Sequence, residues 1–213
     1  MNSFAVENVI KAEQALIRDQ SYPSPRDMVH TSIFSNQNFE QMLTFYQVVL
    51  NMRVVYEINS KIRFVALSFD EENHRIGLVK LPSLEQRPQG TVRIEHLSWR
   101  YRNLPALFNA IRHIEAELGL FPAAVHQGTI ISVSYRDPDE NRCELIVECL
   151  PSQEDIIDFY VNKLAAQPDF NTLLPFNLRG MMEMHAAGEG LANLLNYGWV
   201  KENLPVEGLV TLS

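Results

Sequence analysis

The sequence predicts an α+β fold made of two consecutive βαβββ modules, because one order of elements occurs twice along the chain. Alternating apolar residues indicate the strands, and apolar residues at helical spacing indicate the helix between them. The first copy fills residues 27–82 and the second fills residues 91–150. His30 and His96 each lie midway along the opening strand of a copy, 66 residues apart, so both copies place a histidine at the same position.

In the first module, an opening strand is predicted at 28–34, and a helix follows at 39–50 with Asn38 as its N-cap. Three further strand-like runs complete the module at 53–58, 63–69 and 74–81. The stretch 83–90 is rich in Pro, Gly and polar residues, which is typical of a loop between modules.

The second module opens with a predicted strand at 92–101 that carries His96. Asn103 and Pro105 are the signals that begin a helix, and Gly119 is the signal that ends it. The stretch from residue 124 to residue 149 supplies the remaining strands, so the order of the first module is repeated.

The last two strands, 129–135 and 142–149, form a predicted hairpin around a tight turn at 137–141. Pro138 presets the backbone of this turn, and Asx side chains bond to their own main chain. Alternation with period two gives the second strand a polar face and an apolar face. The polar face comprises Arg142, Glu144, Ile146 and Glu148, and the apolar face comprises Cys143, Leu145, Val147 and Cys149. Glu144 is therefore either a solvated strand residue or a functional carboxylate.

Both ends of the chain are predicted to be helical extensions, over 1–26 and 151–213, and Ser152 with Asp155 resembles a capping box. The formal net charge of −8 argues against nucleic acid as a partner. No run of roughly eighteen apolar residues is present, so no membrane span is expected. The N-terminal residues lack the pattern of a secretory signal, and the two cysteines lie too far apart on one strand to pair. We expect a cytoplasmic protein.

Three stretches carry a resemblance to a known superfamily: FEQMLTFYQVVL at 39–50, DEENHRIGLV at 70–79 and HQGTIISVSYRDPDENRCEL at 126–145. Residues 29–148 resemble the vicinal oxygen chelate superfamily and, within it, the small single-domain type I extradiol catechol dioxygenases. The resemblance implies that the paired modules form a sheet enclosing a metal. It places the metal ligands on His30, His96 and Glu144. Two imidazoles and one carboxylate are the ligand types of the facial triad of non-haem Fe(II), and Mn(II) is the alternative metal.

The resemblance also implies the second set of functional residues. His74 falls at the place of the acid–base histidine, and His126 and Tyr135 fall at the places of the histidine and tyrosine that flank the substrate. The implied reaction opens the ring of a catechol-type aromatic diol with O2. Taken alone, a histidine just before a strand, such as His74, is more often a solvated loop residue, but the three residues together favour the functional interpretation.

Two positions depart from the family pattern, because Glu140 and Asn51 stand where glycine is common. A changed turn at Glu140 would shift Glu144 and leave Glu148 as the alternative ligand. Two other functions stay open: a non-oxidative metal-dependent isomerase, lyase or transferase of the same superfamily, and a metal-free protein that binds a small aromatic ligand. The helical extensions make a homodimer the expected assembly.

Overall fold

The computed structural model describes residues 27–85, 88, 94–164 and 170–206. The predicted helix at the N-terminus lies outside these residues. The elements of the first module are β1 (Thr31–Ser35), α2 (Phe39–Val49), β2 (Arg53–Asn59), β3 (Arg63–Ser68) and β4 (Ile76–Lys80). Those of the second are β5 (His96–Arg100), α3 (Leu104–Leu118), β6 (Ala123–His126), β7 (Ile130–Arg136) and β8 (Arg142–Glu148). The predicted βαβββ repeat is confirmed.

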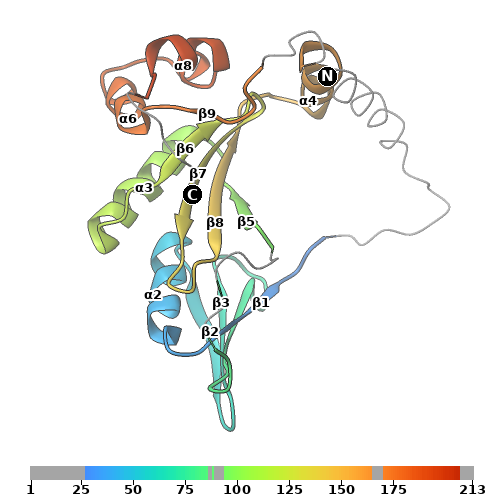
Figure 1. The fold of residues 1–213 in the computed structure, drawn as a ribbon, viewed down its shortest axis with the longest axis vertical. Coiled ribbons are helices and arrows are strands. Elements are labelled where there is room, and N and C mark those ends of the chain that lie inside the picture. Colours follow the sequence, from blue (N-terminus) through green and yellow to red (C-terminus); the bar gives the residue numbers. More distant parts are fainter. Residues whose placement is uncertain (1–26, 86–87, 89–93, 165–169, 207–213) are drawn as a thin grey trace, which may run out of the picture.

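Each module forms its own sheet, and the two sheets share one topology. The strand order is β1-β4-β3-β2 in the first and β5-β8-β7-β6-β9 in the second. The opening strand pairs in parallel with the last strand of its module, and the other pairs are antiparallel. In Figure 1 the sheets follow one another along the long axis, with α2 and α3 on the same side. Their apolar faces pack under these helices into one core.

The described part of the C-terminal extension packs on the second module. It comprises α4 (Gln153–Asp158), the π-helical turn η1 (Phe159–Lys163), β9 (Leu174–Pro175), α6 (Leu178–Ala186), α7 (Leu191–Leu194) and α8 (Tyr197–Asn203). Strand β9 adds to the edge of β6, and Ser152 caps α4 by accepting a hydrogen bond from the Asp155 amide, as predicted. Among the described residues, no helix has the length and apolar character needed to cross a membrane.

The helix signals of the second module are confirmed, whereas one signal of the first is not. Asn103 caps α3 through a 2.9 Å hydrogen bond from the Ala106 amide, and Gly119 ends the helix at φ +66°. Asn38 lies at the start of α2 but makes no side-chain capping bond. Its amide instead donates to the Pro138 carbonyl at 2.9 Å and to Asp139 Oδ1 at 2.8 Å. Asn38 therefore joins the two modules.

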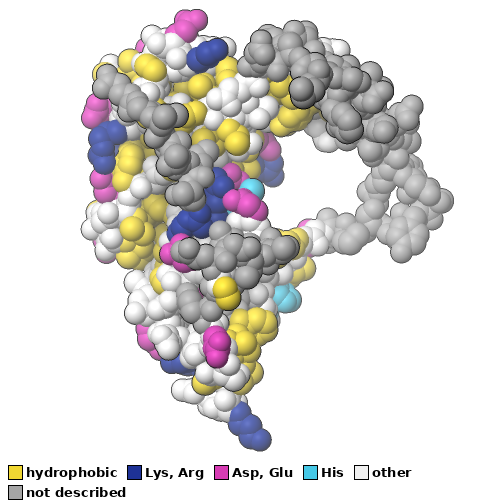
Figure 2. All heavy atoms as spheres, viewed as in Figure 1, with side chains coloured by type: hydrophobic (Ala, Val, Ile, Leu, Met, Phe, Trp, Pro, Cys, Tyr) yellow, Lys and Arg dark blue, Asp and Glu magenta, His cyan; other side chains and the backbone are white. Residues whose placement is uncertain are grey.

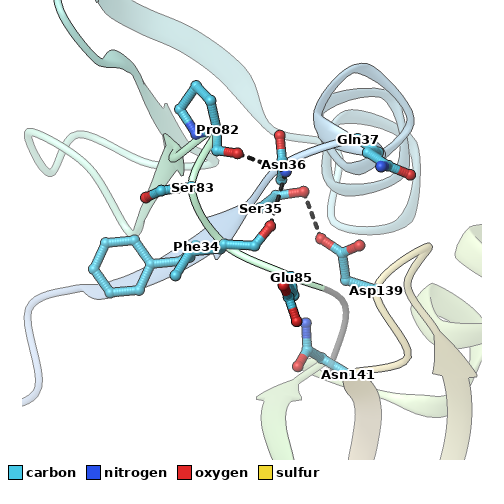
Figure 3. Close-up of a pocket in the computed structure, with 10 residues that line it drawn as sticks. Phe34, Ser35, Asn36, Gln37, Pro82, Ser83, Glu85, Asp139 and Asn141 are labelled. Atoms are coloured by element: carbon cyan, nitrogen blue, oxygen red, sulfur yellow. Dashed lines mark hydrogen bonds between the residues drawn. The ribbon is translucent and has the colours of Figure 1, made fainter. Parts of the chain in front are cut away.

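The turn between β7 and β8 is held by the first module. The Ser35 hydroxyl donates to Asp139 Oδ2 at 2.5 Å, as Figure 3 shows, and the Tyr46 hydroxyl donates to Asp137 Oδ2 at 2.7 Å. Asp137 also accepts hydrogen bonds from the Asp139 and Asn141 amides at 3.0 and 2.8 Å. These contacts fix the turn and therefore the register of β8.

Candidate metal centre

His96 and Glu144 lie side by side at the start of the second sheet. Their strands β5 and β8 are parallel neighbours, and the register aligns Ser98 with Glu144. His96 Nε2 lies 3.2 Å from Glu144 Oε2, and the Ser98 hydroxyl donates a hydrogen bond to the same oxygen. The side chain of Glu144 is 5% exposed and that of His96 is 38% exposed. The pair therefore joins a buried carboxylate to an accessible imidazole.

The spacing of these two atoms fits neighbouring ligands of one metal ion. Donors about 2.1 Å from a metal and about 90° apart lie about 3 Å from each other. Contact between a carboxylate oxygen and the lone pair of a neutral imidazole is unfavourable unless a proton or a cation lies between them. An imidazole and a carboxylate are also the donor types of a ferrous site.

Glu144, rather than Glu148, faces His96. Glu148 pairs instead with Arg100, whose Nη1 lies 2.5 Å from Glu148 Oε1. The expected strain in the turn is present, because Glu140 adopts φ +64°; Asn51, in the loop after α2, likewise adopts φ +50°. The turn thus keeps a conformation that favours glycine, and Glu140 accepts it at a cost of about 1 kcal/mol.

His30 and His74 form a second pair, in the first module. Their ring centroids are 4.3 Å apart, and the rings of Tyr56 and Phe64 lie within 6.3 Å of His74. Partial burial and the neighbouring His30 lower the pKa of His74 below its ordinary value. His74 is therefore neutral near pH 7 and able to accept a proton.

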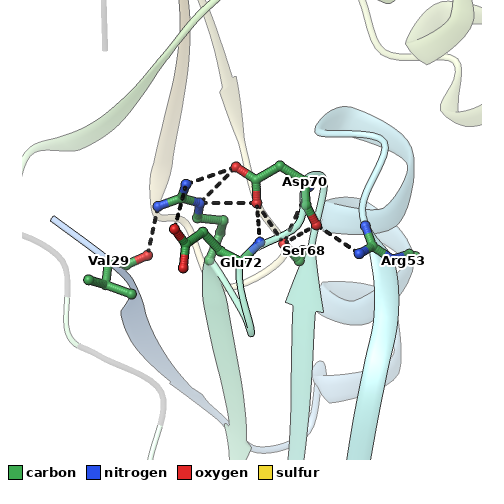
Figure 4. A network of polar contacts seen from close by, with 6 residues as sticks. Val29, Arg53, Ser68, Asp70 and Glu72 are labelled. Atoms are coloured by element: carbon green, nitrogen blue, oxygen red, sulfur yellow. Dashed lines mark hydrogen bonds and ion pairs between the residues drawn. The ribbon is translucent and has the colours of Figure 1, made fainter. Parts of the chain in front are cut away.

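Arg75 holds this pair in place through the network of Figure 4. Its guanidinium bonds to Asp70 with Nη2–Oδ2 at 2.8 Å, and its Nη1 donates to the Val29 carbonyl at 3.2 Å. Asp70 Oδ1 also accepts from the Ser68 hydroxyl at 3.0 Å. The residue after His74 thus fixes the backbone of the residue before His30.

The two pairs belong to different modules. A cavity of about 340 Å³ between β1 and β5 is lined by Thr31, which follows His30, and by His96. A larger cavity of about 560 Å³, shown in Figure 3, is lined by residues such as Ser35 and Asp139 and by none of the six predicted site residues. Within the described ranges, no three His, Cys, Asp or Glu side chains cluster as a ready metal site. The structure assembles two of the proposed ligands, and His30 stays with His74.

Tyr135 and His126 lie on the other face of the second sheet. Tyr135 pairs with Cys143 on the helix-covered face, whereas Ser134 pairs with Glu144. Tyr135 is 4% exposed, and its hydroxyl has no hydrogen-bond partner among the residues that the structure describes. The structure therefore does not bring Tyr135 to the His96–Glu144 pair.

His126 is fully buried beneath the C-terminal extension. Its Nδ1 accepts a hydrogen bond from the Gly128 amide at 3.1 Å, so its Nε2 carries the proton and donates to the Leu195 carbonyl at 3.1 Å. Burial lowers the pKa of His126 to about 4, against a smaller raising effect of the Leu195 contact. These contacts make His126 an anchor of the extension.

Sequence reasoning assigned no role in the site to three polar side chains around the pair. Glu95 accepts from His96 Nδ1 and, at 2.7 Å, from Arg142 Nη1, and Ser98 bonds to Glu144. Glu95 directly precedes His96, and Arg142 lies two residues before Glu144 on its polar face. Period-two alternation marked Arg142, but no sequence signal joined it to Glu95.

Comparison with known proteins identifies relatives over most of the chain. The biphenyl-2,3-diol 1,2-dioxygenase 3 of Rhodococcus globerulus is 30% identical over 180 residues, which cover 83% of this chain and 90% of that protein. The biphenyl-2,3-diol 1,2-dioxygenase 2 of the same organism is 27% identical over 180 residues, covering 81% and 89%. No protein-family model matches the chain.

Among solved structures, a glyoxylase/bleomycin resistance protein/dioxygenase domain from Frankia sp. EAN1pec superposes with a TM-score of 0.50. It is 14% identical, and the match covers 59% of this chain and 93% of that domain. At this identity the likeness concerns the fold, and it agrees with the paired modules described above.

Proposed function

We propose that this chain, which belongs to the vicinal oxygen chelate superfamily and within it to the extradiol dioxygenase family, cleaves the ring of a catechol-type aromatic diol with O2. The observation that supports the proposal most is the His96–Glu144 pair at 3.2 Å, which matches neighbouring ligands of one metal ion. The names of the two bacterial relatives make biphenyl-2,3-diol the first substrate to test.

His96, Glu144 and His30 would hold Fe(II), with Mn(II) as the alternative metal. When bound, the iron would supply open coordination positions and positive charge where the diol and O2 react. Glu144, being buried, would offset that charge, and Ser98 would orient the carboxylate through its hydrogen bond. His30 would come from the first module, where its ring lies beside that of His74.

His74 would move the proton. It is neutral near pH 7 and stands beside His30, so its imidazole is suited to accept a hydroxyl proton from the diol and later return it. Tyr56 and Phe64 present rings next to it, and an aromatic substrate would pack against them. His126 and Tyr135, on the other face of the second sheet, are left out of the proposed mechanism.

The position of His126 and Tyr135 gives weight to a second candidate. A non-oxidative isomerase, lyase or transferase of the same superfamily would use the same two metal ligands, His96 and Glu144. It would not need His74, His126 and Tyr135 together at the substrate. Of these three residues, His74 alone contacts a proposed ligand, His30, among the contacts that the structure describes. The predicted homodimer and cytoplasmic location stay predictions.

The test is oxygen uptake by protein loaded anaerobically with Fe(II), over a panel of catechols that includes biphenyl-2,3-diol. We expect uptake with a yellow ring-cleaved product, and a 10²–10⁴-fold loss of kcat in His74→Ala with metal retained. Glu144→Ala should lose the metal, and His113→Ala, an exposed histidine of α3, is the matched control. Bound metal without uptake of O2 would favour the non-oxidative candidate, and absence of bound metal would leave the aromatic-binding protein.

A further inference from the structure

The surroundings of His96 extend the proposed site by two residues. The two nitrogens of this imidazole face two different carboxylates: Nε2 faces Glu144, and Nδ1 contacts Glu95 Oε2. A carboxylate only accepts hydrogen bonds, so Glu95 requires the proton on Nδ1. The lone pair of a neutral His96 then lies on Nε2, on the side of Glu144. Glu95 therefore selects the form of His96 that binds a metal.

Glu95 is in turn held by Arg142. Arg142 Nη1 donates to Glu95 Oε1 at 2.7 Å, and Arg142 Nε donates to the Ser134 hydroxyl at 3.0 Å. The β5–β8 register places Arg142 directly beside His96. Each oxygen of Glu95 thus has its own partner, and Arg142 is fixed by the neighbouring strand. Figure 2 shows acidic, basic and histidine side chains gathered near the middle of the displayed face.

The Glu95–Arg142 contact differs from an ordinary surface ion pair because Glu95 also contacts His96. The side chain of Glu95 is 62% exposed, so this pair adds little to the free energy of folding. Its specific feature is the third member, His96, which it orients toward Glu144.

We propose that Glu95 and Arg142 are positioning residues that set the tautomer and ring orientation of His96 as a metal ligand. The inference rests on the proposed metal site and goes beyond it, because it assigns a role to residues that do not touch the metal. Loss of such partners typically weakens metal binding 10- to 100-fold.

The test is anaerobic titration of metal-free protein with Co(II), followed by visible absorption, for the wild type and for Glu95→Ala, Glu95→Gln and His96→Ala. We expect the dissociation constant to rise 10- to 100-fold in Glu95→Ala, with a changed Co(II) spectrum. Glu95→Gln keeps an acceptor oxygen for Nδ1 and should recover part of the affinity. The urea midpoint of the metal-free protein should stay unchanged. Glu115→Ala, which breaks the exposed Arg179–Glu115 pair at 2.6 Å, is the matched control.

The outcomes separate the two proposals. Wild-type binding that His96→Ala abolishes, together with unchanged affinity in Glu95→Ala, overturns the positioning role and leaves the metal site standing. A lowered urea midpoint in metal-free Glu95→Ala also overturns it, because the residue would then be structural. Absence of saturable Co(II) binding by the wild type overturns the proposed site, and the positioning role with it.

Discussion

Tyr135→Phe should stabilise the protein, although a family resemblance gives this tyrosine a role at the substrate. The residue is 4% exposed on the helix-covered face, and its hydroxyl has no partner within the described part of the chain. Burial and the neighbouring Tyr101 raise the pKa of the phenol, so the hydroxyl stays neutral. A buried hydroxyl without a hydrogen bond costs about 1–3 kcal/mol, whereas phenylalanine keeps the ring contacts. We expect the free energy of unfolding to rise by about 1 kcal/mol.

Tyr46→Phe is the matched comparison and should have the opposite sign. Tyr46 is 2% exposed, and its hydroxyl donates to the Asp137 carboxylate at 2.7 Å. Hydrogen bonds to charged groups contribute about 1.5–3 kcal/mol, so this variant should lose about 2 kcal/mol. Urea unfolding measures both changes, and kcat on the catechol panel is measured in parallel. A Tyr135→Phe protein that is less stable, or that keeps its metal and loses kcat, would refute the assignment of Tyr135 to the core.

Three further predictions concern backbone strain and the anchor of the C-terminal extension. Glu140→Gly should raise the free energy of unfolding by about 1 kcal/mol in urea unfolding, because Glu140 adopts φ +64°. An unchanged urea midpoint would mean that contacts of Glu140 offset the strain. The pKa of His126 is depressed from 6.5 to about 4, so the unfolded chain binds a proton in that interval and the folded chain does not. Stability should be highest above pH 6.5 and fall by about 3 kcal/mol toward pH 4, a slope that His126→Gln should remove in pH-dependent urea unfolding. Gly128→Ala should destabilise by about 2 kcal/mol or more, since the glycine has φ +91° and an added Cβ would lie 2.2 Å from the Phe159 ring; thermal unfolding at the wild-type midpoint would contradict this.

Local rules predicted most of the fold, because the relevant signals are short and each has one physical meaning. Asn103 and Gly119 mark the ends of α3. Asn51 and Glu140 stand where glycine is common in the family, and both adopt the positive φ that glycine tolerates best. Asn38 was the exception. An Asn side chain bonds to whichever acceptor is nearest, and the neighbouring turn supplies Pro138 and Asp139, which lie about a hundred residues away in sequence. No local rule contains that contact.

In the candidate site, too, local sequence rules predict some features and not others. Alternation along β8 predicted the face of Glu144. The repeat predicted His30 and His96 midway along their opening strands, whereas His30 directly precedes β1 and His96 is the first residue of β5. Neither rule states how far apart the two sheets bring these histidines, since that depends on packing at the junction. Arg75, which follows His74 and directly precedes β4, donates to the carbonyl of Val29, which precedes His30 and β1. Such a contact depends on tertiary structure and leaves no periodic trace in the sequence.

The place of Tyr135, in contrast, follows from two rules that the sequence already satisfies. In an antiparallel hairpin, residues equidistant from the centre of the turn pair and share a face. With the turn centred on Asp139, Glu144 pairs with Ser134 and Cys143 pairs with Tyr135, as the structure shows. Cys143 belongs to the apolar face, so Tyr135 belongs there too and not to the face of Glu144. The residue of β7 that faces Glu144 is Ser134, and its hydroxyl already accepts a hydrogen bond from Arg142. On this face the described part of the chain therefore offers, opposite Glu144, a serine hydroxyl that already accepts from Arg142, so the proposed reaction would take its proton from His74 of the first module.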